Sequence, residues 1–444
     1  MAHLAMAAIS LCLGAVLFDF GLYIPANMML FTLLCGMVSA ASCSRTNQGG
    51  AARRSLVLQS RWMVLFIVGA LGISGVLGLR EVSAAARAYA AVREVPPLVS
   101  PDSLEAQQTD VAIRRLTRAA AGRPDDAELR VRLAELWIYR YRLEAYRLLP
   151  QERPTAPNGA ESEYWQLTGA AVLHQRANAY HRLGDVTRLE KLRSDLIVQS
   201  NLEPAIEHLV AAKRACPILP RIDLQLAALS FVRDPNSPSG EKHLRNAVHL
   251  TPGDPDVLYA AGALAGHAWL DELMYEYWRR SLDLSWRYKD VILTEARSRM
   301  ELPTIINRVL PDSPQLLIEL ARTDYAGEQS QEERALLVAR AKELVASHRS
   351  QLSEIQWHHF HAVAYQVEGR FEESIASYIR AIELDPLQIE WRFKLAKLLE
   401  QEGRIEQAYE EARLCALLAP DCKDYRSLVH ELNACRLRRH SAGS

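Results

Sequence analysis

Two consecutive stretches near the C-terminus decide the fold of this chain: residues 355–388 (IQWHHFHAVAYQVEGRFEESIASYIRAIELDPLQ) and 389–422 (IEWRFKLAKLLEQEGRIEQAYEEARLCALLAPDC). Three markers of the first stretch recur 34 residues later in the second: Gly369 and Gly403, Ala381 and Cys415, Pro386 and Pro420. Apolar residues recur every three to four positions within each stretch, which indicates amphipathic helices. A glycine near the middle and a proline near the end predict two helices in each copy.

These residues resemble the tetratricopeptide repeat family, in which a helix pair of about 34 residues stacks on its neighbours. The first stretch fills the aromatic and small positions of the family with Ala362, Tyr365, Tyr378, Ala381 and Pro386, and has Ser374 where alanine is usual. The second lacks the aromatics but keeps Leu395, Ala396, Leu399, Ala408 and Pro420. Because one repeat cannot bury its own apolar face, the resemblance implies a stacked solenoid.

The chain upstream of these stretches predicts further, less regular copies. The spacing of a second helix is seen in Ala205, Leu209, Ala212 and Pro217, and again in Ala247 and Pro252; Leu133, Ala134 and Trp137 follow Pro124 as a first helix would. Residues 174–196, with Tyr180 and Gly184, predict a pair with a lengthened second helix. We expect off-period helices at 286–353 and a disordered insertion at 150–160. The fold class is therefore all-α, with an irregular array over 103–435, clearest at 355–422, and a solvated tail at 436–444.

The N-terminal part predicts membrane-spanning helices. Residues 2–42 form a long, mostly apolar run in which His3 and Asp19 are the only His, Asp, Glu, Lys or Arg residues, and as one helix they would be roughly 60 Å long, about twice a bilayer core. The stretch 18–27 (FDFGLYIPAN) interrupts this run, because Gly21 suits a turn and Pro25 a first helical position. We expect a transmembrane hairpin at 1–42, a basic cytoplasmic loop at 43–61, a third span at 62–80 and a linker at 81–102. This topology puts the repeats outside the cytoplasm.

The interruption also resembles the C-terminal membrane hairpin of bacterial O-antigen ligases and polymerases. Their D-F-x-L-x-I-P-A-N motif is matched by Asp19, Phe20, Leu22, Ile24, Pro25, Ala26 and Asn27, whereas the preceding His-Ser pair is replaced by Ala15-Val16. The resemblance covers residues 1–80 at most and implies a bacterial inner membrane. In that family the catalytic Arg and His lie in a loop that has no counterpart here. We therefore expect no catalytic residue in this chain and interpret Asp19 as a helix cap.

Composition and motifs narrow the remaining function classes. The 52 Lys and Arg against 53 Asp and Glu give a net charge of −1, so nucleic acid is not an expected partner. The seven cysteines form no CxxC pair, and no nucleophile motif or phosphate loop is present, so we expect no metal and no cofactor. His358 and His361 share a helix face and are interpreted as packing residues. Cys415, Cys422 and Cys435 are compatible with one disulfide or with free thiols.

By resemblance, the first helix of each repeat lines a concave groove. That register exposes His359, Val363 and Gln366 in one repeat, followed by Phe393, Lys397 and Glu400 in the next. A groove that mixes these side chains suits an extended or helical peptide segment. The alternative, that all six belong to ordinary solvated faces, stays open.

We therefore expect a membrane-anchored scaffold that recruits protein partners, including a polytopic glycan-assembly protein, to a site of polysaccharide assembly at the inner membrane. One alternative is the C-terminal part of a split or truncated O-antigen ligase or polymerase that lacks its catalytic loop. A third interpretation is a membrane-tethered adaptor unrelated to polysaccharide, with the match at 19–27 a coincidence.

Overall fold

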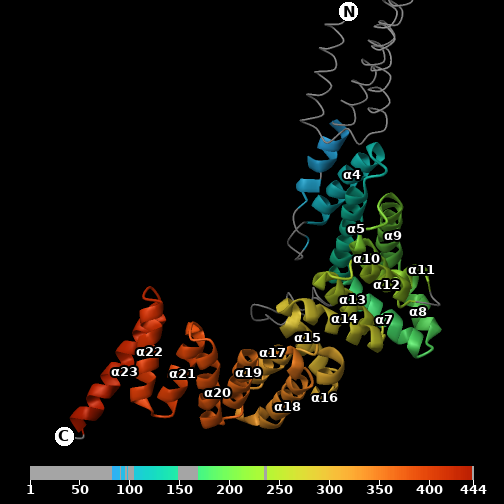
Figure 1. Cartoon of the computed structure of the whole chain (residues 1–444). Coiled ribbons are helices and arrows are strands. Elements are labelled where there is room, and N and C mark those ends of the chain that lie inside the picture. The colour runs from blue at the N-terminus through green and yellow to red at the C-terminus, as the bar shows by residue number, and fades with distance from the viewer. Residues whose placement is uncertain are drawn as a thin grey trace, which may run out of the picture. The chain divides into compact units, whose positions relative to one another are not determined.

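The computed structural model describes residues 83–90, 92–95, 98, 105–148, 169–234 and 238–442. The chain divides into two compact units, Met1–Arg87 and Ala88–Ser444, and nearly all described residues belong to the second (Figure 1). The predicted membrane hairpin with its motif, the basic loop, the third span and the insertion at 150–160 lie outside the described residues. Among the helices that are described, none is long and apolar enough to cross a membrane.

Every regular element in the described part of the chain is helical. The first group comprises α4 (Ala106–Gly122), α5 (Ala127–Arg147), α7 (Ala170–Arg182), α8 (Val186–Arg193), α9 (Leu196–Ala215), α10 (Pro220–Ala228) and α11 (Ser230–Arg233). The next comprises α12 (Glu241–Leu250), α13 (Pro255–His267), α14 (Asp271–Leu284), η2 (Trp286–Tyr288), α15 (Lys289–Arg297), α16 (Leu302–Thr304) and the π-helical η3 (Ile305–Val309). The last comprises α17 (Pro314–Thr323), η4 (Glu328–Ser330), α18 (Gln331–Ser347), η5 (Arg349–Gln351), α19 (Glu354–Val367), α20 (Phe371–Leu384), α21 (Ile389–Gln401), α22 (Ile405–Leu418) and α23 (Lys423–Ala442). Residues 83–90 are also helical, within the predicted linker.

The two C-terminal repeats form as predicted. Helices α19 and α20 pack together, as do α21 and α22. Each turn is closed by a glycine in the left-handed region, Gly369 and Gly403, both with φ of 73°, a conformation that costs glycine little. Ser374, at the position where alanine is usual, is fully buried, and its hydroxyl donates a 2.7 Å hydrogen bond to the Ala362 carbonyl. The serine therefore ties the two helices of its repeat together.

The predicted tail at 436–444 begins within α23, which packs on α22 and continues to Ala442, and Leu437 and Arg438 of this helix are exposed. Leu428 and Leu432 bury their side chains in the C-terminal core. The Arg436 guanidinium lies 4.3 Å from the Tyr409 ring centroid on α22, so the contact between the two helices extends to residue 436.

A third pair, α13–α14, has the register of α19–α20 at an offset of 100 residues. Gly262 and Ala362 take the small position of the first helix, and Trp278 and Tyr378 take the large position of the second. A Cβ on Gly262 would lie 2.7 Å from the Trp278 Nε1, so the absent side chain makes room for the indole. At the turn, Trp269 has φ of 62° where the other pair has Gly369.

Helix α5 packs on α9, which is not the next helix in the sequence. Helices α7 and α8 lie between the two in sequence. Helix α5 buries one side, with Leu129 and Leu133, in the core beside α4, and another, with Val131 and Ala134, in the core formed with α9. The lengthened second helix predicted within 174–196 is wrong, because α8 ends at Arg193. The reason is that the Asp195 carboxylate accepts a 2.8 Å hydrogen bond from the Ile197 N–H and starts α9 as a new helix.

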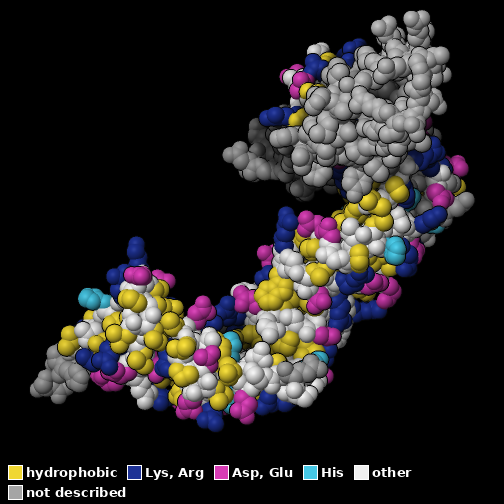
Figure 2. All heavy atoms as spheres, turned by 45° about the horizontal axis from the view of Figure 1, so that its top comes forward, with side chains coloured by type: hydrophobic (Ala, Val, Ile, Leu, Met, Phe, Trp, Pro, Cys, Tyr) yellow, Lys and Arg dark blue, Asp and Glu magenta, His cyan; other side chains and the backbone are white. Residues whose placement is uncertain are grey.

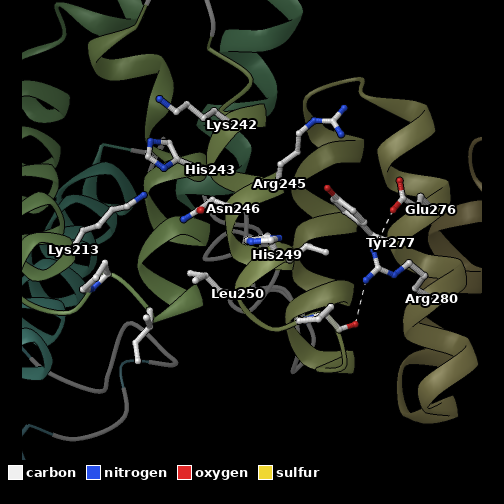
Figure 3. Close-up of a pocket in the computed structure, with 14 residues that line it drawn as sticks. Lys213, Lys242, His243, Arg245, Asn246, His249, Leu250, Glu276, Tyr277 and Arg280 are labelled. Atoms are coloured by element: carbon white, nitrogen blue, oxygen red, sulfur yellow. Dashed lines mark hydrogen bonds and ion pairs between the residues drawn. The ribbon is translucent and has the colours of Figure 1, made fainter.

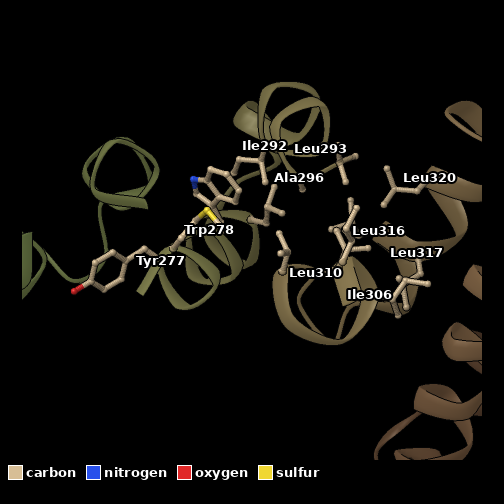
Figure 4. Close-up of a cluster of buried hydrophobic side chains, with 14 of the residues drawn as sticks. Tyr277, Trp278, Ile292, Leu293, Ala296, Ile306, Leu310, Leu316, Leu317 and Leu320 are labelled. Carbon is tan, nitrogen blue, oxygen red and sulfur yellow. The ribbon is translucent and has the colours of Figure 1, made fainter. Parts of the chain in front are cut away.

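The off-period region carries the largest apolar core in the described part of the chain. This core includes residues from α10 and α12 through α18 to α19, and Figure 4 shows part of it. The indole of Trp278 lies beside Ile292, and Trp278, Ile292, Leu293 and Leu316 are each at most 1% exposed. The helices therefore pack continuously through the region in which the 34-residue sequence period is lost.

Candidate partner-binding groove

Helices α19 and α21 are the first helices of the two regular repeats, and they carry the six predicted groove residues. A capping box starts α19, in which the Ser353 hydroxyl accepts from the Gln356 N–H and the Gln356 side chain accepts from the Ser353 N–H. Five of the six predicted residues are half-buried and Lys397 is exposed. The interpretation as six ordinary solvated side chains therefore fits Lys397 best.

His359 is a packing residue between repeats. Its ring stacks on Trp391 of α21 with centroids 4.4 Å apart and planes 15° apart, and its edge faces Tyr378 of α20. Burial, followed by the charge of Lys394, lowers the pKa of His359 to about 4. The imidazole is therefore neutral near pH 7, and its flat ring packs between the two repeats.

Val363 and Gln366 lie on the same helix as His359. Val363 packs against both the large central core and the C-terminal core, so it marks the junction between them. The Gln366 carbonyl accepts a 3.1 Å hydrogen bond from the Gly369 N–H and helps to close the turn. Val363 therefore has a packing role, whereas the contact of Gln366 is made by its backbone, and the predicted groove role of its side chain stays a prediction.

Phe393 and Lys397 form a second group on α21. The Phe393 ring lies 4.8 Å from the ring of Tyr425 on α23, and the Lys397 ammonium lies 4.6 Å from the Phe393 centroid. This arrangement, in which an exposed cation lies over one ring and a second ring packs beside that ring, can hold an apolar side chain and a carboxylate of a bound peptide. Glu400 is half-buried one turn further along the helix. The structure thus groups Phe393 with Lys397, and groups His359 with Trp391.

Sequence reasoning missed the aromatic ladder on another face of α19. Trp357, His361 and Tyr365 follow one another at four-residue spacing, with ring centroids 4.3 Å and 5.7 Å apart. Three cations lie over the outer rings of this ladder: Arg349 over Trp357, and Lys342 and Arg370 over Tyr365. The i, i+4 spacing was visible in the sequence, whereas the cations, which come from neighbouring helices, were not.

The histidines and cysteines of this region are part of the packing. His361 lies in the ladder, with both ring nitrogens buried and without a hydrogen-bond partner. Cys415, Cys422 and Cys435 are free thiols. Burial raises the pKa of Cys415 to about 11, and its thiol donates to the Ile389 carbonyl at 3.6 Å. In the part of the chain that the structure describes, no three His, Cys, Asp or Glu side chains come close enough to hold a metal ion.

Comparison with known proteins supports the repeat. Residues 358–386 match the family model of the tetratricopeptide repeat. No curated protein matches the chain. Among solved structures, it is similar to yeast Tom70, at 12% identity over 75% of this chain and 86% of that one, with a TM-score of 0.26. It is also similar to the Cut9–Hcn1 hetero-tetramer of the APC/C, at 14% identity over 76% and 68%, with a TM-score of 0.26.

A further similarity is to Naa15/Naa10 bound to HypK-THB, at 14% identity over 76% of this chain and 55% of that one, with a TM-score of 0.30. All these identities and TM-scores are low, so the fold assignment rests on the helix pairs of the chain itself and on the matched repeat. The chain carries a tetratricopeptide repeat at 358–386 within an all-α array of helix pairs, an architecture that points to protein–protein interaction.

Proposed function

We propose that this chain is a membrane-anchored scaffold that binds a segment of a partner protein along α19 and α21 and holds it near a site of envelope polysaccharide assembly. The observation that carries the binding role is the group formed by Phe393, Tyr425 and the exposed Lys397. Aromatic rings beside a cation are typical of the residues that dominate binding energy in interfaces. The apolar N-terminal runs and the motif at 19–27 support the membrane and polysaccharide parts of the proposal.

A photo-crosslinking experiment tests the binding role. A photoreactive amino acid replaces the exposed Lys397, and a matched chain carries it at the exposed Arg380 on α20. We expect a crosslinked protein partner at position 397, not at 380, and its loss when Phe393→Glu is added. Equal crosslinking at both positions, or a crosslink that survives Phe393→Glu, contradicts the groove.

Reporter fusions test the membrane part. Alkaline phosphatase fused after Ser444 is expected to be active, since the proposed topology puts the repeats outside the cytoplasm. A fusion within residues 43–61 is expected to be inactive. Activity in the reverse pattern contradicts this topology.

The motif at 19–27 also favours a second candidate, one part of a split O-antigen ligase or polymerase. This candidate predicts co-purification with a many-helix membrane protein that bears the Arg- and His-containing loop. It also predicts that Pro25→Leu impairs glycan assembly. Unimpaired assembly in that variant counts against any link of this chain to polysaccharide.

A further inference from the structure

A groove with a volume of about 1020 Å³ lies between α9, α12 and α14. These are the second helices of three successive pairs, α5–α9, α10–α12 and α13–α14. The groove is therefore formed by the layer of second helices, whereas the binding surface proposed on α19 and α21 belongs to first helices. Figure 3 shows Lys213, Lys242 and His243 on one side and Glu276, Tyr277 and Arg280 on the other, with Arg245 and His249 between them.

The charged side chains of the groove are mostly cations. Four Lys or Arg residues line it, Lys213, Lys242, Arg245 and Arg280, together with the imidazoles of His243 and His249 and a single carboxylate, Glu276. On the face shown in Figure 2, side chains of the two signs are interspersed along the described helices. With a net charge of −1 for the whole chain, this excess of cations is local.

A buried carboxylate beneath the groove fixes part of this arrangement. Asp223 is fully buried and accepts hydrogen bonds from Lys213, from His243 at 2.7 Å and from Asn246 at 2.6 Å. Although burial alone raises the pKa of Asp223, these hydrogen bonds lower it, so the carboxylate stays ionised. Lys213, His243 and Asn246 are thereby held along one wall of the groove.

The remaining cations keep capacity for a ligand. Arg245 pairs with Glu241 at 2.8 Å, and Arg280 pairs with Glu276 at 3.1 Å and donates to the Pro252 carbonyl at 3.2 Å. Each guanidinium has five N–H donors, so these contacts leave some unused. Lys242 is exposed and has no ion pair among the described residues. An incoming carboxylate therefore meets Lys242 first.

The groove also has an apolar wall. Pro217, Val248, Leu250 and Pro252 line it beside Ile218, which is 69% exposed on the loop after α9. An exposed isoleucine next to a row of cations is matched by a ligand that carries apolar side chains as well as carboxylates.

Shape and composition favour one class of ligand. A flat membrane surface cannot enter a groove, and single-stranded nucleic acid needs exposed rings on which bases stack, whereas Tyr277 is only 3% exposed. We propose that this groove binds an extended acidic peptide segment of a partner protein, with its carboxylates at Lys242, Arg245 and Arg280 and an apolar side chain against Ile218. The chain would then hold two proteins on two layers of one array.

Fluorescence anisotropy on the full chain in a non-ionic detergent tests this proposal. The probe is a fluorescein-labelled octapeptide that alternates Glu-Glu with Leu, and its control has Gln in place of each Glu. We expect the acidic peptide to bind more tightly than the control, and its affinity to fall with rising salt. Lys242→Glu together with Arg245→Glu should weaken binding about tenfold or more, as roughly 1.4 kcal/mol or more of lost interaction implies.

The matched control is Arg380→Glu, a charge reversal on exposed α20 outside the groove, which should leave the affinity unchanged. Two results overturn the proposal: equal binding of the Gln peptide, or equal binding by the double variant. Binding of vesicles of phosphatidylglycerol and phosphatidylcholine that is lost in the double variant, without binding of the peptide, assigns the cations to a membrane surface and also overturns it. The Lys397 crosslink should persist in the double variant, so failure here and failure of the α19–α21 groove are distinguishable.

Discussion

The pairs α13–α14 and α19–α20 share one register but solve the same packing problem with different residues. In α19–α20, Ala362 and Tyr378 are both fully buried in one core, and a glycine closes the turn. In α13–α14, the larger Trp278 meets the smaller Gly262, and Trp269 closes the turn. In these two pairs a larger side chain on the second helix is thus matched by a smaller residue on the first.

The turn differs in a way that volume does not explain. Trp269 is 45% exposed, and its ring lies 5.0 Å from the guanidinium of Arg182, which belongs to the inserted helix α7. A bulky residue in the left-handed region is a conformational outlier. Here the same residue that strains the turn also contacts the insertion, whereas Gly369 closes its turn without such a contact.

Trp278→Ala should have the largest effect on this comparison. The indole is 1% exposed within the largest core of the described residues, so its removal should lower the free energy of unfolding by about 3–5 kcal/mol. Urea denaturation followed by circular dichroism measures this change. Leu183→Ala is the control, because Leu183 is 77% exposed and its loss should be close to neutral. Similar losses in the two variants would contradict the assignment of this core.

The second-largest effect should come from lowering the pH, which should destabilise the packing of α7 on its neighbours. Burial, and then the charge of His267, lowers the pKa of the fully buried His174 to about 4. Because the unfolded chain binds this proton more readily, the stabilising contribution is present above pH 6.5 and is lost as the pH falls toward 4. The full difference corresponds to roughly 3 kcal/mol.

Thermal unfolding as a function of pH measures this effect. His174→Gln should flatten the dependence between pH 6.5 and 4, whatever its effect at neutral pH. An unchanged slope in that variant would show that another group titrates. His359, whose pKa is also lowered to about 4, should contribute a separate acid-sensitive step at the C-terminal repeats.

Gly262→Ala should lower the free energy of unfolding by about 1–2 kcal/mol. The new methyl group overlaps the Trp278 ring, and this overpacking outweighs the gain in helix propensity. Adding Trp278→Tyr recreates the Ala362–Tyr378 combination, so the double variant should be more stable than the sum of the single changes predicts. A double-mutant cycle measures the coupling, and strict additivity would contradict the volume exchange.

Gly369→Ala should have the smallest effect and lower the free energy of unfolding by about 1 kcal/mol. No atom lies within 4 Å of the new Cβ, so the cost comes from the left-handed backbone alone. Gly122→Ala is matched to it, since its Cβ is equally unobstructed but its φ lies outside the left-handed region, and it should be neutral or stabilising. Chemical denaturation of both variants separates backbone strain from packing.

Some of this arrangement was predictable from the sequence, and the limits have physical causes. The helix pairs at 355–422 were predicted because glycine, small residues and proline fix them locally. The α13–α14 pair was missed because Trp269 and Trp286 replace the expected glycine and proline. The predicted first helix near Leu133 and second helix near Ala205 are both real, but that they form one pair was hidden by the insertion between them.

The two candidate binding sites were likewise predictable only where their residues follow the repeat pattern. The repeat register chose residues on α19 and α21, but it did not show that His359 is covered by Trp391 or that Phe393 contacts Tyr425. The cationic groove between α9, α12 and α14 was not foreseen, because its residues come from three helices and Asp223, which orders one wall, lies on a fourth. Contacts between helices that are distant in sequence leave no periodic signal.

The pairing of α5 with α9 has a consequence for synthesis of the chain. Residues 148–195 must emerge before α9 begins, whereas three residues separate α19 from α20. At typical rates of translation this takes roughly 2–10 s, and closing the longer loop costs about 2 kcal/mol more in chain entropy. The side chains of Val131 and Ala134 therefore stay exposed on the nascent chain until α9 is made, even after α4 has packed on the other side of α5. We therefore expect the N-terminal part of the array to expose apolar surface for longer during synthesis than the locally closed C-terminal repeats do.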